Sequence, residues 1–463
     1  MANEKVEFHR LYEWLIHEIT QKGRFDAYEG FEVVFPGRLF SKQVLKDVMS
    51  QLFSCLKEYL AEEEMDRTPV LPEILAIRAL RQNNLTKVVK TEIRALRKKI
   101  SKQPPEVGEL LHEQFLLARE STLLAGNVRH SVHEDGPLSA NSLIGQIELD
   151  YLDLYYFTEK LRLGCELINR GTILKEQYEL RLLPELVAYL MEHPALTEPY
   201  PVLKLYLKIY LLLTQPEEGS HFFELVGLLE VHQSQLGGAE VKGLYKYAQN
   251  HCIRRVNLGE MKYLGELSRL YEAQLQNGRL FSNGELAHTS YLNIVTTGLR
   301  LRRYGWVSEF IHTYREKVPA DYRESVYAYC MAAFHYEQQA YQQAARLLQE
   351  VTFVDVFYQI SARLLLCKIY FEKEDDEALF YAADAFGRYL KRNKELSPQN
   401  RVHYLNFLSC LKSLTKLREQ FYRIKAEPYT ARWEKVAVRL KSMEKVSNLA
   451  WLQERLQNLK GTS

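Results

Sequence analysis

Cues for extended or irregular structure are scarce in this sequence. Only 22 glycines and 14 prolines are spread over 463 residues, which excludes collagen-like and low-complexity chains. Hydrophobic residues make up 46% and charged residues 26%, a balance that excludes a wholly disordered chain. Strand-like alternation of apolar and polar residues is almost absent, and apolar residues instead recur every three or four positions. The sequence therefore predicts an ordered, all-α protein.

Net charge, paired cysteines and long apolar runs are also missing. The 61 basic residues nearly cancel the 59 acidic ones, so no global field favours nucleic acid or membrane. The six cysteines are far apart and form no C-x-x-C pair, which indicates buried thiols in a reducing compartment. No segment reaches the roughly 18 uncharged apolar residues of a membrane span, and the charged start MANEKVEFHRLYEW does not resemble a signal peptide. We expect a cytoplasmic protein with no membrane contact.

Catalytic and cofactor signatures are absent as well. There is no G-x-S-x-G, no H-E-x-x-H and no kinase set. The stretch LGGAEVKG, residues 236–243, lacks the spacing of a phosphate-binding loop, and a Gly-Gly turn between helices explains it. The stretch HSVHED, His130 to Asp135, has metal-ligand residue types, but Gly126, Gly136 and Pro137 bracket it as a solvated loop. We predict no metal, no cofactor and no enzyme activity, and we rank a catalytic site assembled from distant residues below the functions given next.

The first 140 residues are predicted to form an N-terminal helical region. Between the first two helices, FEVVFPGR is the one short run with strand character. The polar stretch 127–141 is the main internal loop and ends this region. The helices expected before it cover 5–22, 41–63 with Ser41 as N-cap, 70–103 with a break near Asn83-Asn84, and 105–127.

Residues 141–395 are predicted to form a helical-repeat array. The ends of successive first helices can be placed at Gly171, Pro216, Gly259, Gly305, Ala340 and Glu374. Their spacings are 45, 43, 46, 35 and 34 residues, as expected for stacked antiparallel hairpins, each of which is completed by its neighbours. The last spacing matches the 34 residues between Ala344 and Ala378, which we expect at close helix crossings. The segment 396–463 is predicted to add two or three capping helices.

These hairpins resemble tetratricopeptide-like repeats, in which a helix with a bulky-then-small pair precedes a break, an aromatic and an alanine. The similarity is clearest over 290–392 and looser over 150–289. The whole chain also resembles uncharacterised helical proteins of Bacteroidota-type bacteria. The residues that carry the repeat resemblance are Leu163-Gly164 before Gly171, Gly305-Trp306, Ala332, Ala340-Tyr341, Ala344 and, in part, Leu366, Asp375 and Ala378.

The resemblance implies an α-solenoid whose first helices line a groove for a protein or peptide. Packing within the core is the alternative for each tyrosine of that groove. Arg363 is followed one turn later by Cys367, so the Lys and Asn pair that clamps a peptide carboxylate in one subfamily is not matched. The residues similar to the ligand-contacting positions are Tyr291, Arg302, Tyr329, Tyr336, Arg363 and Tyr370.

Two basic regions keep a second function open. Residues 74–103 carry nine basic side chains and one acid, and Lys87, Lys90, Arg94 and Lys98 share one helical face. Residues 401–463 carry thirteen basic side chains and five acids. A solvated helix face is the alternative explanation. We therefore expect a non-catalytic scaffold or adaptor that binds a protein partner, with a nucleic-acid-associated helical protein or regulator as the alternative.

Overall fold

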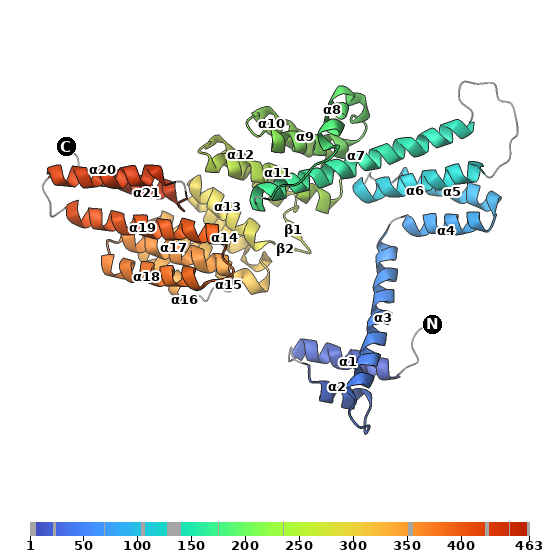
Figure 1. Ribbon diagram of the computed structural model, residues 1–463, viewed down its shortest axis with the longest axis horizontal. Coiled ribbons are helices and arrows are strands. Elements are labelled where there is room, and N and C mark those ends of the chain that lie inside the picture. The colour runs from blue at the N-terminus through green and yellow to red at the C-terminus, as the bar shows by residue number, and fades with distance from the viewer. Residues whose placement is uncertain are drawn as a thin grey trace. The chain divides into compact units, whose positions relative to one another are not determined.

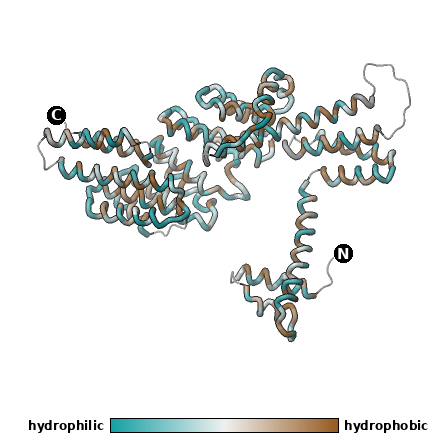
Figure 2. The backbone as a smooth tube through the Cα atoms, viewed as in Figure 1, coloured by the Kyte–Doolittle hydropathy of each residue, from teal (hydrophilic) through white to brown (hydrophobic). Residues whose placement is uncertain are grey.

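The chain forms two compact units, Met1–Glu240 and Val241–Ser463, and the division falls within α11 (Gly238–Asn257). The computed structural model describes residues 6–21, 25–68, 70–102, 107–126, 140–174, 176–234, 236–350, 355–421, 426–443 and 445–460. These residues are overwhelmingly helical, and hydrophobic and hydrophilic positions alternate along the helices (Figures 1 and 2). The predicted all-α fold is confirmed. The predicted domain boundaries at 140 and 395 stay predictions.

The N-terminus contains three helices, α1 (Val6–Gln21), α2 (Ala27–Val34) and α3 (Lys42–Arg67). The strand character assigned to FEVVFPGR was wrong, because its first residues lie in α2. Asp26 caps this helix by accepting the backbone N–H groups of Tyr28 at 2.7 Å and Glu29 at 3.2 Å. A Cβ atom at Gly30 would lie 2.7 Å from the Trp14 ring, so glycine permits the close packing of α2 on α1.

The remaining helices of the first unit follow the predicted pattern. The break near Asn83-Asn84 is confirmed, and Asn84 holds a left-handed φ of 59°. The end predicted at Gly171 was wrong, since α7 continues through it. Gly164 allows α8 to approach, because a Cβ there would lie 2.3 Å from Leu183. These helices are α4 (Leu71–Gln82), α5 (Thr86–Ile100), α6 (Val107–Gly126), α7 (Ala140–Leu174), α8 (Leu183–Glu192), α9 (Pro201–Thr214) and α10 (Gly219–His232), with a 3₁₀ turn at Pro194–Leu196.

The second unit is a row of antiparallel hairpins in which α13 packs on α14, α15 on α16, α17 on α18, and α19 on α20. First helices also contact the next first helices, α13 with α15 and α15 with α17. Stacked antiparallel helix hairpins are thus confirmed. Their bounds are α12 (Lys262–Gln276), α13 (His288–Arg300), α14 (Tyr304–Thr313), α15 (Ala320–Glu337), α16 (Tyr341–Glu350), α17 (Val356–Glu372), α18 (Asp376–Arg392), α19 (Pro398–Phe421), α20 (Ala426–Ser442) and α21 (Leu449–Asn458), with a 3₁₀ turn at Arg315–Lys317.

One small sheet interrupts the second unit. β1 (Phe281–Ser282) pairs antiparallel with β2 (Glu285–Leu286), with Phe281 opposite Leu286. The two strands are joined by Asn283 and Gly284, whose φ values of 51° and 79° are those of a tight hairpin turn. Asn-Gly is the residue pair that such turns favour.

The hairpin turns of the second unit set the true repeat register. Arg302, Gln339 and Glu374 adopt left-handed φ values of 56°, 59° and 58° at the ends of α13, α15 and α17. The end predicted at Gly305 was therefore wrong: the turn precedes it, and Gly305 lies inside α14. Gln339 and Glu374 are 35 residues apart, one more than the predicted 34.

This one-residue difference changes which positions are equivalent. Five residues after its turn, each second helix buries one side chain completely: Val307, Ala344 and Leu379 each have a relative exposure of 0%. Ala378 is only half-buried. Ala344 thus occupies the predicted close crossing, whereas its structural counterpart is Leu379 and not Ala378.

Five of the six cysteines are buried, as predicted, and all six are free thiols. Burial raises the pKa of each of these five, to about 12 for Cys252 and Cys367. The other three are Cys165, Cys330 and Cys410. Cys55, on α3, is half-buried.

Candidate partner-binding site

The last described helix, α21, lies across the first helices of the second unit. Trp451 inserts its ring beside Phe371 of α17 and Phe407 of α19, with centroid distances of 5.5 and 6.2 Å. Leu452 and Leu456 are 0% and 3% exposed and belong to the same apolar core. We call the surface beneath this helix the α21 site, made of Tyr336, Lys368, Phe371, Glu372 and Phe407.

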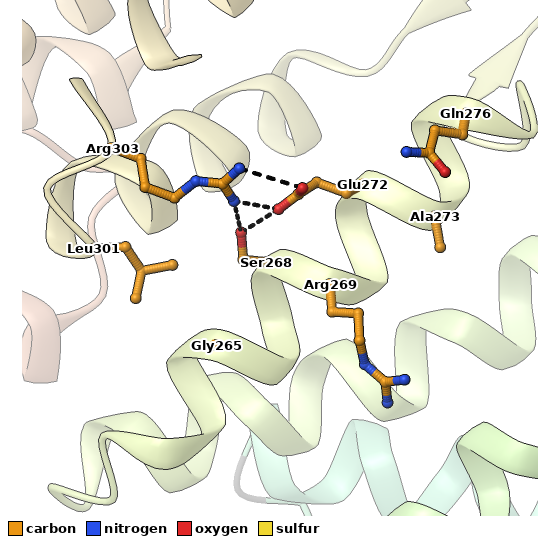
Figure 3. A pocket seen from close by; sticks show the side chains of 8 residues that line it. All are labelled: Gly265, Ser268, Arg269, Glu272, Ala273, Gln276, Leu301 and Arg303. Atoms are coloured by element: carbon orange, nitrogen blue, oxygen red, sulfur yellow. Dashed lines mark hydrogen bonds and ion pairs between the residues drawn. The ribbon is translucent and has the colours of Figure 1, made fainter. Parts of the chain in front are cut away.

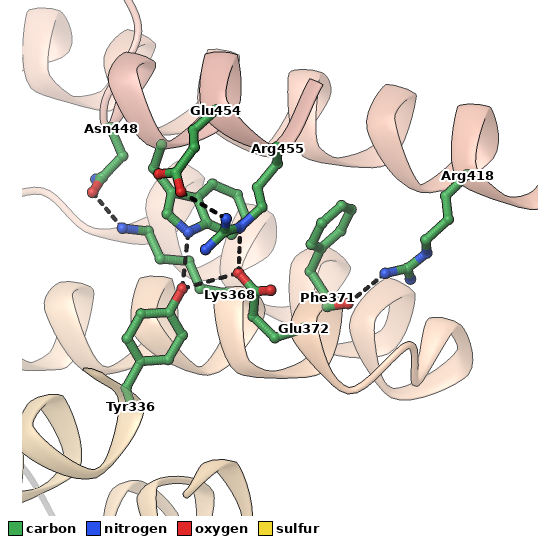
Figure 4. Close-up of polar contacts among 9 residues, drawn as sticks. Tyr336, Lys368, Phe371, Glu372, Arg418, Asn448, Glu454 and Arg455 are labelled. Atoms are coloured by element: carbon green, nitrogen blue, oxygen red, sulfur yellow. Dashed lines mark hydrogen bonds and ion pairs between the residues drawn. The ribbon is translucent and has the colours of Figure 1, made fainter. Parts of the chain in front are cut away.

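Polar contacts fix α21 in register on this surface (Figure 4). The Trp451 indole N–H donates to the Tyr336 hydroxyl at 2.8 Å, and that hydroxyl donates to Glu372 at 3.2 Å. Arg455 donates from Nε to the same Glu372 oxygen at 2.6 Å. The Lys368 ammonium donates to the Asn448 side-chain oxygen at 2.6 Å. Contacts from α15, α17 and α19 therefore converge on a single helix.

The segment before α21 follows α19 through backbone contacts. The Ser447 N–H donates to the His403 carbonyl at 3.2 Å, and the Asn406 side-chain amide donates to the Lys445 carbonyl at 2.9 Å. Asn448 then turns the chain into α21 with a left-handed φ of 53°. The whole segment 445–458 is thus docked by specific hydrogen bonds as well as by apolar burial.

Electrostatics at the α21 site are set by partial burial of charge. Burial lowers the pKa of Lys368 to about 8, against the opposing attraction of Glu337 and Glu372. Its ammonium also lies 5.2 Å from the centroid of the Trp451 ring. The Arg455–Glu372 pair is well shielded, with side-chain exposures of 21% and 15%. Breaking such a pair costs more than breaking an exposed one.

The six candidate partner-binding residues fall in different places. Tyr336 alone belongs to the α21 site. Tyr291 is fully buried, and its hydroxyl donates to the Ile311 carbonyl at 2.6 Å, so it is a packing residue. Arg302 is exposed in the α13–α14 turn, and Tyr329 is half-buried with its ring 6.2 Å from that of Tyr358.

The register difference explains the other two. Arg363 lies over the ring of Tyr389 in α18 at 4.2 Å, and Tyr370 accepts a hydrogen bond from Gln349 of α16 at 2.8 Å. Both therefore face second helices. Arg363 and Tyr370 lie 34 residues after Tyr329 and Tyr336, one residue short of the 35-residue register, and one residue rotates an α-helix by about 100°. The true counterpart of Tyr336 is Phe371, and Glu372 follows it.

The basic residues of 74–103 divide into two groups. Arg78 and Arg81 bind the buried Glu120 at 3.0 and 2.6 Å, and these contacts join α4 to α6. Arg97 and Lys99 contact Ser121 and Glu73. The predicted face is different: all its members are exposed on α5, and no ion pair involves them among the described residues. These members are Lys87, Lys90, Arg94 and Lys98.

Six of the thirteen basic residues of 401–463 make contacts within the fold. Arg418 bonds the Phe371 carbonyl and Asp376, which ties α19 to the α17–α18 turn (Figure 4). Arg439 donates to Ser409 at 2.9 Å. Others in internal contacts are Arg401, Lys412, Arg455 and Lys460. A basic face formed by the remaining residues of 401–463 stays a prediction.

A polar pocket lies between α12 and the start of α14 (Figure 3). Arg303 reaches across it to Glu272 and donates to the Ser268 hydroxyl at 3.0 Å. Despite burial, which acts in the opposite direction, the bonds from Arg303 and Ser268 lower the pKa of Glu272. The arginine also stacks over Trp306 at 4.9 Å. Arg303 pairs with Glu272, and Arg269, which also lines the pocket, pairs with Glu266 at 3.0 Å, so each charged side chain of the pocket already has a partner.

Two stretches that the sequence singled out, HSVHED and LGGAEVKG, can be compared with the described residues. The stretch HSVHED lies outside them. Of the stretch LGGAEVKG, only Leu236 and Gly237 precede α11; the other six residues form its beginning, so the predicted Gly-Gly turn was wrong in placing both glycines between helices. Within the described part of the chain, no three His, Cys, Asp or Glu side chains gather as metal ligands would. None of its helices is long and apolar enough to cross a membrane.

Comparison with known proteins identifies no family. No protein-family model matches the sequence, and no curated protein is significantly similar to it. Among solved structures, the chain is similar to one in the crystal structure of the APC/C hetero-tetramer Cut9–Hcn1, at 11% identity. The match covers 99% of this chain and 97% of that chain with a TM-score of 0.29, too low to carry a functional argument.

Proposed function

We propose that this protein is a non-catalytic scaffold or adaptor that binds a helical segment of a protein partner on the first helices of its second unit. The observation that supports this is α21 itself. A helix already lies on α15, α17 and α19, anchored by one tryptophan and one arginine. Helix-in-groove recognition uses anchors at this i, i+4 spacing, and Trp and Arg are the residues most often dominant in such contacts.

The α21 site also indicates the chemistry of the partner. Phe371 and Phe407 receive an aromatic ring, and Glu372 receives a cation one helical turn away. A partner would present an amphipathic helix with an aromatic residue and an arginine four positions later. It would have to displace α21, whose attachment to the chain gives it a high effective concentration.

A labelled peptide with the sequence of residues 445–460 tests this proposal. The full-length chain should bind it weakly, because its own α21 competes. Replacing Trp451 and Arg455 with alanine in the chain should loosen α21 and tighten peptide binding, measured by fluorescence anisotropy.

Glu372→Arg, added to that loosened chain, should abolish the gain. Glu374→Arg is the matched control, since it makes the same charge change at an exposed turn residue two positions away. The proposed binding mode would be contradicted if the chain without Trp451 and Arg455 did not bind the peptide, or if Glu372→Arg and Glu374→Arg had equal effects on peptide binding. Circular dichroism checks that each variant stays folded.

Nucleic-acid binding is the second candidate function, and the exposed face of α5 supports it. Its four basic side chains are spread over twelve residues, a rise of about 16 Å along the helix, which suits a run of phosphates. If nucleic acid binds here, replacing all four with glutamine should reduce the slope of log affinity against log salt by about 3 to 4. A control chain should keep its slope when it loses another four exposed basic residues, Arg388, Lys391, Arg392 and Lys394. No binding of DNA or RNA at low salt would remove this candidate.

The cellular location is also part of the proposal. A cytoplasmic location in a Bacteroidota-type bacterium is supported by the overall resemblance and by the six free cysteines. Fractionation of the native cell would test it, and recovery with a membrane or outside the cell would contradict it. Affinity capture with and without nuclease separates the two candidate functions, since only nucleic-acid-dependent complexes are lost on digestion.

A further inference from the structure

A second cavity, of about 350 Å³, lies between α12 and α14 and adjoins the polar pocket of Figure 3. Glu272 and Gln276 of α12 line both of them. We call the second cavity the α14 pocket. Its other lining residues are Leu275, Trp306, Glu309, Phe310, Thr313 and Tyr314. None of these eight side chains is basic, and two of them are carboxylates.

Three aromatic rings form one wall of the α14 pocket. Trp306, Phe310 and Tyr314 recur every four residues, so they line up along one face of α14 and its C-terminal cap. The centroids of neighbouring rings lie 5.6 and 4.9 Å apart. Phe281 of β1 stacks on Tyr314 at 5.9 Å and closes the row. The faces of aromatic rings are electron-rich and attract cations.

Packing between hairpins does not require aromatic rings at these positions. Trp306 and Phe310 lie four and eight residues after the left-handed turn residue that precedes α14. The same two positions of α16 and α18, counted from their own turn residues, hold polar, aliphatic or small side chains, namely Gln343, Leu347, Ala378 and Ala382. Among these three second helices, the aromatic wall is particular to α14.

Both carboxylates of the α14 pocket can accept further hydrogen bonds. Glu309 is exposed, and no described residue pairs with it. Glu272 receives Arg303 and Ser268 mainly on Oε1, and its Oε2 atom has only a 3.3 Å contact with Arg303 among the described residues. An ionised carboxylate can accept about four hydrogen bonds. The pocket therefore combines ring faces with acceptor oxygens, an environment that suits a cation.

Arg303 shows which cation these groups accept. Its guanidinium lies over the Trp306 ring at 4.9 Å and donates to Glu272, so an arginine of the chain already occupies the first ring of the row. No described cation lies over Phe310 or Tyr314. Arginine suits such a place better than lysine, because its planar group stacks on rings while it donates to carboxylates.

We propose that the α14 pocket binds an arginine side chain of a polypeptide partner. The guanidinium lies against the rings of Phe310 and Tyr314. Its N–H groups donate to Glu309 and to the Oε2 atom of Glu272. This pocket is built by second helices and shares no residue with the α21 site on the first helices. A scaffold with both sites holds a partner at two separate places, which raises the overall affinity.

Fluorine NMR of the full-length chain labelled with 5-fluorotryptophan tests the proposal. The chain has four tryptophans, and Trp306→Phe identifies the signal of Trp306. Titration with acetyl-Gly-Arg-Gly-amide should shift that signal until it saturates. The same peptide with citrulline keeps the shape of arginine without its charge and should leave the signal in place. No shift up to the solubility limit of the arginine peptide, or an equal shift with citrulline, would overturn the proposal.

Two substitutions locate the contact. Glu309→Gln should weaken binding of the arginine peptide about 2- to 5-fold, because it removes one exposed charge pair. Tyr314→Leu should weaken it by about 2- to 5-fold as well, because leucine is apolar but has no ring face. Glu377→Gln is the matched control, since Glu377 is an exposed glutamate of the second helix α18 and should not affect the affinity.

Equal affinities of the Glu309→Gln and Glu377→Gln chains would overturn the assignment of the pocket. A lysine peptide that binds as tightly as the arginine peptide would overturn the choice of a guanidinium. Circular dichroism checks the fold of each variant. If Tyr314→Leu loses helix content, the exposed Glu309→Gln decides the outcome by itself.

Discussion

Two of the three hairpin turns with a left-handed residue hold Gln339 and Glu374, and replacing either residue with glycine should stabilise the protein. Gln339 and Glu374 have φ values of 59° and 58°. Both turns close in the same way: the Ala340 N–H bonds the His335 carbonyl at 2.8 Å, and the Asp375 N–H bonds the Tyr370 carbonyl at 3.0 Å. This is the helix ending at which glycine is most favoured.

The magnitude follows from two opposing terms. An L-residue in this conformation costs about 1–2 kcal/mol, and glycine removes that cost. Glycine also loses more backbone entropy on folding, which offsets about 0.5–1 kcal/mol of this stabilisation. Gln339→Gly and Glu374→Gly should therefore each raise the free energy of unfolding by about 0.5–1 kcal/mol. The sites lie in separate turns, so their effects should add in the double variant.

Urea melts followed by circular dichroism measure the effect. The neighbouring residues Gln338 and Lys373 provide controls, because their φ values of −89° and −76° suit any residue. Glycine at either control should lower stability by about 0.5–1 kcal/mol. Opposite signs at adjacent positions are the result expected. Shifts of the same sign at Gln338 and Gln339 would refute the assignment of the turn, and with it the 35-residue register.

Three further predictions concern packing and pH. Ala344→Leu should lower the free energy of unfolding, measured by a urea melt, by about 1–3 kcal/mol because the site is fully buried. Ala378→Leu and the exposed Ala320→Leu should change it by no more than about 0.5 kcal/mol. Equal losses at Ala344 and Ala378 would support the 34-residue register instead. Gly298→Ala should destabilise despite alanine's better helix propensity, because its Cβ would lie 2.5 Å from a Val307 methyl; a gain in melting temperature would contradict this. Lys368 has a pKa near 8 in the folded chain, below its unfolded value of about 10.4, so the unfolded chain binds more protons between these two pH values. In that range the free energy of unfolding of the wild type, relative to that of Lys368→Met, should rise by up to about 1.4 kcal/mol per pH unit. A difference between the two chains that does not change with pH would refute the lowered pKa.

Helix positions were predictable because amphipathic periodicity is a local signal. The helices expected at 5–22 and 41–63 match α1 and α3, and Ser41 caps α3 by accepting the Val44 N–H at 3.4 Å. FEVVF was misassigned because β-branched and aromatic residues favour strands only weakly. Asp26 starts a helix there, and α1 buries its face.

Turn positions were predictable only where glycine or proline marks them. Gly259 and Pro216 lie between helices as expected. Arg302 closes a hairpin without any such marker, and the visible Gly305 drew the predicted end three residues too far. Matching Ala344 to Ala378 made a similar error of one residue. A small slip in register is enough to reverse which side chains face a groove.

The α21 site could not be found from spacing. Trp451 and Arg455 are one turn apart in the sequence, but they lie in the segment 396–463, for which only capping helices were predicted and no binding role. Their partners Tyr336 and Glu372 lie 115 and 83 residues earlier. Contacts at such separations depend on how the hairpins stack, and this stacking leaves no local pattern in a single sequence.

The buried thiols can report local opening of the fold. A thiol-specific reagent reacts only with the thiolate, so a buried cysteine of raised pKa is labelled when its surroundings open. Cys330, Cys367 and Cys410 lie in α15, α17 and α19, one in each of three successive first helices, and Cys252 lies in α11. Their labelling rates, resolved by mass spectrometry, would give a local opening free energy for each step of the array without any substitution. Protection that changes helix by helix would then map where a bound partner stiffens the stack.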